Sequence, residues 1–254
     1  MKVKTIVALL GLSASLGAAA DPLQPNSPTP SVINPAPGGE GSLQSIADNL
    51  FGPGHIDVNT QQSSAGQWMS ATPGATSTIP TLVAEFTANA GTQSFGIWFG
   101  TDTNSIVSYN LLLGGAVATD AVGVTISGNT LNVFGPAAGC GTHFVCGSFT
   151  DARINSSAFG FYFQPSPSAP IYYSLDQLNA LENPGDPRSD RFVAFQDGTT
   201  TNWLFAYEDG TDFDYNDMAV KVESINAVPE PETYAMMLAG LGAMGFVARR
   251  RKSR

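Results

Sequence analysis

Basic residues are scarce in this chain of 254 residues, which has 11 Lys and Arg against 21 Asp and Glu. Residues 21–228 hold nineteen acidic side chains and only four basic ones, a formal net charge of −15. The four are Arg153, Arg188, Arg191 and Lys221. A surface this acidic repels phosphate backbones, so we expect no binding to nucleic acid.

Signatures of several common enzyme classes are also missing. The chain contains no Gly-x-Ser-x-Gly, no His-Glu-x-x-His and no Gly-Lys-Ser/Thr sequence, which excludes the usual serine-hydrolase, zinc-protease and P-loop patterns. We therefore expect a protein that is not an enzyme. The alternative is a secreted glycan-active hydrolase, because a pair of Asp or Glu residues is sufficient for that reaction.

The longest apolar runs lie at the two chain ends. At the N-terminus, two lysines precede an apolar run at 6–16, and Ala18 and Ala20 provide the small residues that signal peptidase accepts. This pattern is typical of a secretory signal peptide, which we assign to residues 1–20 and expect to be removed.

The C-terminal apolar run, residues 234–247, lies between a Pro-Glu-Pro motif and a basic cluster. As a helix it covers only about 25 Å of a bilayer core of ~30 Å, so it predicts a single transmembrane helix that holds the protein transiently. The basic cluster would stay in the cytoplasm. The motif consists of Val228, Pro229, Glu230 and Pro231, and the basic cluster of Arg249, Arg250, Arg251 and Lys252.

These features, in this order at the chain end, resemble the PEP-CTERM sorting signal, here over residues 227–254. The resemblance implies processing by an exosortase in a Gram-negative bacterium that makes exopolysaccharide. It also implies export by the Sec route, transient anchoring in the inner membrane, and a final place at the cell surface or in the extracellular matrix. An ordinary tail anchor is the alternative.

The only cysteines are Cys140 and Cys146, with His143 between them. In an exported protein such a pair is expected to form a disulfide that closes a small loop. A Cys-His-Cys zinc site is the alternative, but it lacks a fourth ligand because the other histidine, His55, is distant in sequence.

Composition divides the exported part into three regions. Residues 21–41 contain six prolines and few bulky apolar residues, which predicts a disordered linker. Residues 42–80 form a lead-in with one short helix at 42–50, indicated by apolar residues at helical spacing. Residues 81–226 form the main domain.

Short apolar or alternating runs separated by Gly, Asn and Pro predict an all-β domain, an antiparallel β-sandwich. The predicted strands are 82–87, 94–99, 106–113, 122–126, 131–134, 159–164, 191–195, 203–207 and 218–222. Ser127-Gly128-Asn129 predicts a hairpin turn, and the leucine spacing at 174–182 predicts one or two helical turns.

An acidic loop joins the last two predicted strands. Within residues 208–217, six side chains carry carboxylate or amide oxygens, and no Lys or Arg separates them. The six are Glu208, Asp209, Asp212, Asp214, Asn216 and Asp217. Ca²⁺ takes six to eight oxygen ligands from flexible loops, so we predict a calcium site, with Mg²⁺ less suitable. A solvated loop without an ion is the alternative, but Phe213 and Tyr215 are expected to anchor the loop in the core.

An EF-hand does not fit this loop. Glu223 falls at the twelfth position of such a loop, but Asp217 stands at the sixth, where the turn needs Gly. Residues 218–222 alternate as a half-buried strand does. We therefore expect the metal to hold the mouth of a hairpin closed.

Residues 159–222 resemble a β-sandwich domain of uncharacterised function that recurs in bacterial surface proteins and repeat adhesins. The resemblance is carried by the Phe-Gly-Phe-Tyr-Phe, Tyr-Tyr-Ser and Arg-Phe-Val-Ala-Phe runs and by Glu-Asp followed by Asp-x-Asp-Tyr-Asn-Asp. It implies calcium at the six oxygen-bearing residues of the loop. Similar domains often have His where this chain has Arg191, which leaves the role of this position open.

The sequence thus predicts an exported, non-enzymatic protein of the cell surface or biofilm matrix, with a calcium-stabilised β-sandwich. Binding of exopolysaccharide through the metal-ordered loop is the most specific activity that we expect.

Overall fold

The computed structural model describes most of the chain between its two ends. The described residues are 23–24, 26, 31–72, 76–78, 81–85, 91–116, 120–135, 140–179, 191–210, 212–229, 239–241 and 244. The predicted signal peptide with Ala18 and Ala20, the Glu230 and Pro231 of the sorting motif, and the basic cluster 249–252 lie outside them.

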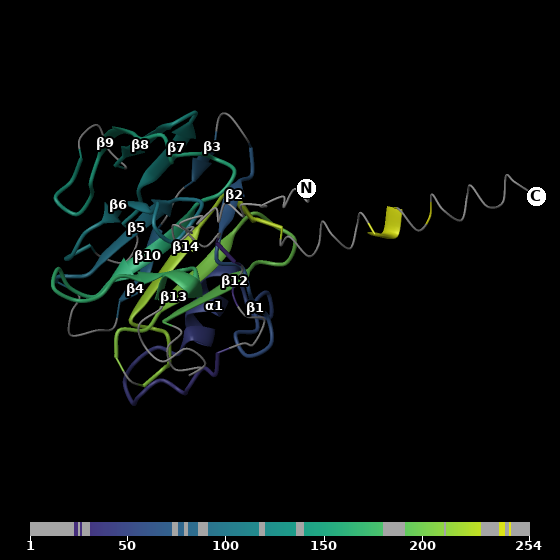
Figure 1. The fold of residues 1–254 in the computed structure, drawn as a ribbon. Coiled ribbons are helices and arrows are strands. Elements are labelled where there is room, and N and C mark those ends of the chain that lie inside the picture. The colour runs from purple at the N-terminus through teal and green to yellow at the C-terminus, as the bar shows by residue number, and fades with distance from the viewer. Residues whose placement is uncertain are drawn as a thin grey trace, which may run out of the picture.

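The described part is mostly β, and every pairing between its strands is antiparallel (Figure 1). A five-stranded sheet has the order β1-β12-β13-β14-β4, and a four-stranded sheet has the order β11-β10-β5-β6. The first sheet consists of β1 (Gln62–Ser63), β12 (Phe192–Gln196), β13 (Trp203–Tyr207), β14 (Met218–Val222) and β4 (Thr81–Glu85). The second consists of β11 (Tyr172–Tyr173), β10 (Gly160–Gln164), β5 (Ser94–Phe99) and β6 (Val107–Leu112).

The two sheets share a core of aromatic side chains. Phe161 of β10 lies 5.0 Å from Phe205 of β13, between ring centroids, and Phe163 lies 5.2 Å from Tyr207. Trp68 contacts both sheets, with its ring 5.8 Å from Phe161 and 4.6 Å from Phe205. Such pairs stabilise a core by about 0.5–1.5 kcal/mol each beyond the burial of their surface. Two antiparallel sheets facing each other across this core are consistent with a β-sandwich.

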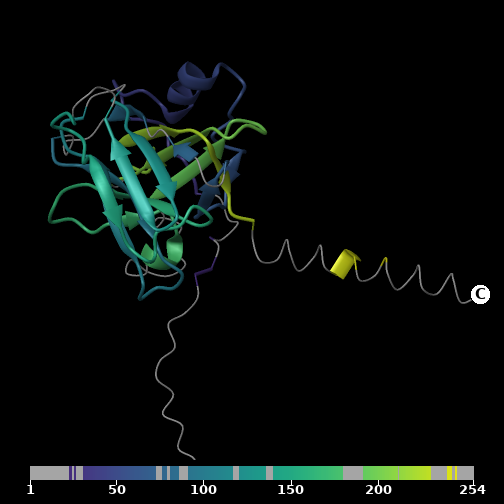
Figure 2. The ribbon, with the colours of Figure 1, turned by 90° about the horizontal axis from the view of Figure 1, so that it is seen from above.

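A short helix covers the outer face of the five-stranded sheet. In α1 (Leu43–Phe51), Leu43, Ile46 and Ala47 are buried against a second cluster that includes Leu204 and Ala206 of β13. Figure 2 shows α1 at the edge of the molecule, outside the strands. Because both faces of β13 are covered, all five of its residues are buried and its sequence is apolar without alternation.

On the outer face of the four-stranded sheet, two glycines make room for two aromatic rings. A Cβ at Gly96 would lie 2.3 Å from the ring of Tyr162, its partner on β10, and a Cβ at Gly160 would lie 2.3 Å from the ring of Trp98 on β5. Each ring therefore lies over the glycine that faces it across the ladder, and this packing leaves Trp98 fully buried.

A second four-stranded sheet has the order β3-β7-β8-β9. Its strands are β3 (Thr76–Thr78), β7 (Gly123–Ser127), β8 (Thr130–Phe134) and β9 (Gly147–Thr150). Gly128 has φ +57° in the turn between β7 and β8, as the predicted hairpin requires. A last pair joins β2 (Trp68–Ser70) to β15 (Ile225–Ala227), so the last strand of the domain pairs with one of its first strands.

Most predicted elements are confirmed within one or two residues, including the helix expected at 42–50 and found at 43–51, and the strands 94–99, 203–207 and 218–222. The predicted helical turn appears as η1 (Asp176–Asn179). The strand β14 also confirms that residues 218–222 are not the second helix of an EF-hand. Residues 31–41 were expected to be part of a disordered linker. In the structure they lie against the domain, where Asn34 N donates to Phe213 O at 2.8 Å.

Candidate metal centre

The acidic loop closes the hairpin of two central strands. β13 and β14 pair from Trp203↔Val222 to Tyr207↔Met218, and residues 208–217 join their ends. Neighbouring strands cover both sides of this hairpin, β12 on one side and β4 on the other. The loop is therefore attached to the most enclosed part of the five-stranded sheet.

Two aromatic residues turn inward and hold the loop to the domain. Tyr215 is fully buried in the cluster beneath α1, and Phe213 packs against the same cluster. Both have positive φ, 57° at Phe213 and 56° at Tyr215, a conformation that is uncommon for residues other than glycine. The expectation that these residues anchor the loop is confirmed.

Carboxylates of the loop accept hydrogen bonds from its own main chain. Glu208 Oε1 accepts from Gly210 N at 2.7 Å, and Asp217 Oδ2 accepts from Asp209 N at 2.7 Å. Glu208 is fully buried and Asp217 is 8% exposed. These bonds fix both carboxylates in place, since each is tied to the backbone beside it.

Three of the predicted ligands converge. Glu208, Asp212 and Asp217 each offer an oxygen, and these atoms all lie within 4.8 Å of one another. Two oxygens bound to one Ca²⁺ at about 2.4 Å can be at most about 4.8 Å apart, so this spacing suits a single ion. The residues present therefore fit a calcium ion.

Burial makes the negative charge of this group unfavourable. It raises the pKa of Asp217 to about 8, and the charges of Glu208 and Asp209 act in the same direction. Burial likewise raises the pKa of Glu208 and of Asp214. A divalent cation between these carboxylates would reverse the effect, because it favours the charged form.

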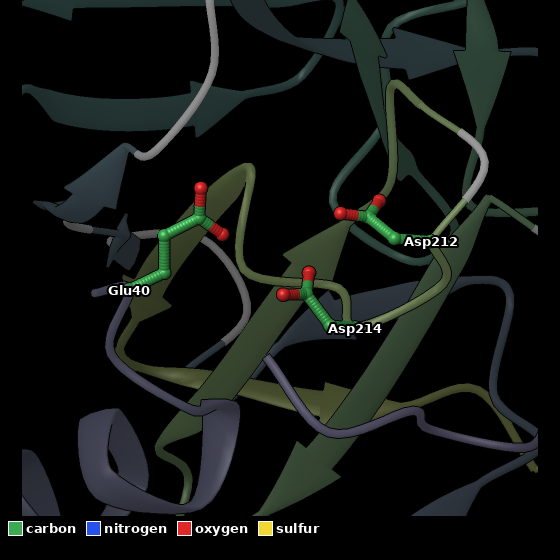
Figure 3. A group of neighbouring side chains, drawn as sticks. All are labelled: Glu40, Asp212 and Asp214. Atoms are coloured by element: carbon green, nitrogen blue, oxygen red, sulfur yellow. The ribbon is translucent and has the colours of Figure 1, made fainter. Parts of the chain in front are cut away.

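A second group shares Asp212. Glu40, Asp212 and Asp214 also place one oxygen each within 4.8 Å of one another (Figure 3). Glu40 and Asp212 are exposed, whereas Asp214 is buried. Sequence reasoning missed Glu40, because it lies far upstream in a segment that was assigned to the linker.

The two remaining predicted ligands make other contacts. Asp209 is in neither group, and its Oδ2 accepts from Gln93 Nε2 at 3.3 Å. Asn216 donates from Nδ2 to Gly41 O at 3.1 Å, and its main-chain N donates to Asp214 Oδ1 at 3.2 Å. Their hydrogen bonds attach the loop to neighbouring segments.

Arg191 contacts the acidic loop, although it is not one of residues 208–217. Its guanidinium donates to Gly210 O and lies over the ring of Phe213, 5.1 Å from the centroid, and over Tyr172 at 5.7 Å. The position that was left open by the resemblance therefore braces the loop backbone. A planar guanidinium suits both contacts, since it can donate in its plane and stack on its face.

The cysteines lie elsewhere, between β8 and β9. Cys140 and Cys146 are joined by a disulfide, as predicted. Because each sulfur is bonded to the other, the alternative of a Cys-His-Cys zinc site does not apply.

The chain end is attached to the domain up to the start of the sorting motif. β15 ends at Ala227, and Val228 N donates to Gln67 O at 3.0 Å. Residues 227–252 match the PEP-CTERM protein-sorting motif. The motif implies that the protein is exported, processed by an exosortase and sorted to the cell surface in a Gram-negative bacterium.

Among curated proteins and among solved structures, none matches the chain. Among the residues that the structure describes, no helix has the length and apolar character needed to cross a membrane. Most of the predicted transmembrane segment, residues 234–247, lies outside the described residues.

Proposed function

We propose that this is a non-enzymatic protein of the cell surface or biofilm matrix whose β-sandwich is stabilised by Ca²⁺ in the acidic loop. The observation that carries the proposal is the convergence of Glu208, Asp212 and Asp217 at the closed end of the central hairpin. An ion there would hold β13 and β14 together, and so would support the centre of the sheet.

Calcium suits this group better than magnesium. All three donors are carboxylates on an irregular loop, and Ca²⁺ accepts such flexible oxygen sets. Mg²⁺ demands near-ideal octahedral geometry and releases its waters reluctantly. Since Asp212 is exposed, an ion bound to it also has room for ligands from outside the protein.

Exopolysaccharide is the external ligand that we propose. Sugar hydroxyls are oxygen donors of the kind that Ca²⁺ accepts, and they could complete its coordination at the exposed side of the loop. Trp203 is not available to stack on a sugar, because this residue is 1% exposed and its Nε1 donates to Ile225 O.

The sorting signal supports the proposed location. We propose that the apolar run at 234–247 holds the exported chain briefly in the inner membrane, and that exosortase cleavage near Pro229 then releases it to the surface or matrix. The attachment of Val228 to Gln67 means that cleavage after this point would leave the domain complete.

Thermal unfolding tests the calcium proposal. A free ligand concentration of about 100 times Kd stabilises a protein by about 2.7 kcal/mol. For a domain of roughly 200 residues this corresponds to a rise in Tm of about 5–10 °C. We expect this rise when Ca²⁺ is added to protein stripped with EDTA, and expect Asp217→Asn to abolish it. Glu223→Gln is the matched control, because Glu223 follows the end of β14 that is opposite the acidic loop and pairs with Lys221.

A glycan hydrolase is the second candidate, because a carboxyl with a pKa of about 8, as at Asp217, resembles a general acid. Glu208, a carboxylate in the same group, is buried and accepts main-chain hydrogen bonds, which favours a structural role. Turnover of exopolysaccharide by wild type that disappears in Asp217→Asn, with unchanged melting, would support the hydrolase. Loss of the calcium response without turnover in either form would support the first proposal.

A further inference from the structure

Asp214 is a buried carboxylate with only one of its oxygens hydrogen-bonded. The residue is 1% exposed, and Oδ1 accepts from Asn216 N at 3.2 Å. Among the residues that the structure describes, none donates a hydrogen bond to Oδ2. A buried carboxylate oxygen without a partner is costly, so this atom needs a ligand that the described side chains do not provide.

The groups opposite Asp214 have the same sign of charge. Glu40 and Asp212 each place an oxygen within 4.8 Å of an Asp214 oxygen and of each other. In Figure 3 the three carboxylates point toward a common space, one from the segment before α1 and two from the acidic loop. Like charges this close repel, whereas a cation between them would satisfy all three.

Glu40 is brought to this space by contacts along its segment. Asn34 N donates to Phe213 O at 2.8 Å, and Asn34 Nδ2 donates to Asp212 O. At the other end, Gly41 O accepts from Asn216 Nδ2. Residues 34–41 are therefore held across the loop at both ends, with Glu40 beside the second attachment.

We propose that Glu40, Asp212 and Asp214 bind a second divalent cation, of the Ca²⁺ class, separate from the ion proposed between Glu208 and Asp217. Asp212 contributes to both, since a carboxylate has two oxygens. The second ion fastens residues 31–41 to the loop. This inference rests on the proposed calcium function through the shared Asp212, but it makes its own claim about Glu40 and the number of ions.

Titration calorimetry with CaCl₂ tests the claim on the full-length chain, extracted in detergent and stripped with EDTA. We expect two ions per wild-type chain and one in Glu40→Gln. Glu223→Gln, which removes a half-buried carboxylate just after the end of β14 that is opposite the acidic loop, should retain two. Because Glu40 is exposed, its substitution should leave the fold intact, which the near-ultraviolet circular dichroism spectrum checks.

Each other outcome has a defined meaning. No binding to wild type overturns both this inference and the proposed function. Equal numbers of ions and equal affinities in wild type and Glu40→Gln overturn the second site alone. A single ion that is lost in Glu40→Gln, or two ions that are both lost, overturns the separation into two sites.

Hydrogen exchange measures whether Ca²⁺ holds residues 31–41 against the acidic loop. Addition of Ca²⁺ should slow exchange in residues 31–41 by at least about tenfold in wild type, as expected when an ion closes a local opening. In Glu40→Gln the same residues should show no such change, while residues 208–217 remain protected. Equal slowing of residues 31–41 in both proteins would overturn the proposal.

Discussion

Asn216 donates a hydrogen bond to the carbonyl oxygen of Gly41, 3.1 Å away, although the two residues are 175 positions apart in the sequence. Asn216 is 1% exposed, so its amide is shielded from water. This bond attaches the segment before α1 to the acidic loop. It brings residues from opposite ends of the domain to one candidate metal centre.

Asn216→Ala should loosen this attachment. Loss of a buried hydrogen bond with one partner left unsatisfied costs about 1–3 kcal/mol, so we expect the free energy of unfolding to fall by that amount. Urea denaturation measures it. Asn104→Ala, at an exposed turn position, is the control and should change stability by less than about 0.5 kcal/mol. Equal stability of the two variants would contradict the role of the Asn216 side chain.

Stability without calcium should decrease as the pH rises. In the folded protein the pKa of Asp217 is raised to about 8 from a usual value of 3.8. The folded state therefore holds a proton between these pH values that the unfolded state releases. Its stabilising effect is complete below about pH 4 and is lost as the pH rises through about 8.

Melting scans in EDTA at pH 5.5 and pH 8.5 measure this effect, and we expect the lower Tm at pH 8.5. Ca²⁺ should raise Tm more at pH 8.5 than at pH 5.5, because protons compete for the same oxygens. Asp217→Asn should reduce the dependence, since asparagine cannot lose a proton. A higher Tm in EDTA at pH 8.5 would be the opposite of what burial predicts.

Arg191→Ala should destabilise the loop. The substitution removes the hydrogen bond to Gly210 O and the stacking on Phe213, and we expect a loss of about 2 kcal/mol by urea denaturation. Arg153→Ala is a matched control. That arginine pairs with Asp151 on the surface, where such a pair contributes about 0–1 kcal/mol. Similar losses in both variants would argue against a specific brace at Arg191.

Truncation at the sorting motif should separate two parts of the chain end. A chain that ends at Val228 keeps β15 and its pairing with β2, so its Tm should equal that of the full domain. A chain that ends at Ser224 loses the fully buried Ile225, which also accepts from Trp203 Nε1. We expect this shorter chain to lose at least about 2–3 kcal/mol. If it melts at the same temperature, β15 does not belong to the stable unit.

The strands with strong apolar runs could be predicted from sequence, whereas the short ones could not. β5, β13 and β14 were predicted with their observed bounds, because each is a run of five or six residues that contains aromatic or β-branched side chains. β1 and β11 have only two residues each, Gln-Ser and Tyr-Tyr. Such strands form because a neighbour such as β12 or β10 offers an edge, and this is a property of the assembled sheet.

Only part of the candidate metal centre could be predicted from the sequence. The acidic loop could be identified because its ligands are close in sequence. Residues 31–41 were assigned to a linker because their composition does not predict regular structure, and they have none. Their order comes from hydrogen bonds to the loop, which local composition does not reveal.

By itself, the sequence determined the all-β class, the central strands, the disulfide pair, the sorting motif and the six oxygen-bearing residues at 208–217, since each is a local pattern of neighbouring residues. Tertiary structure decided which carboxylates converge, how Arg191 braces the loop and where Glu40 lies. Those relationships join segments that are distant in the chain, and they exist only after the sheets, α1 and residues 31–41 have packed together.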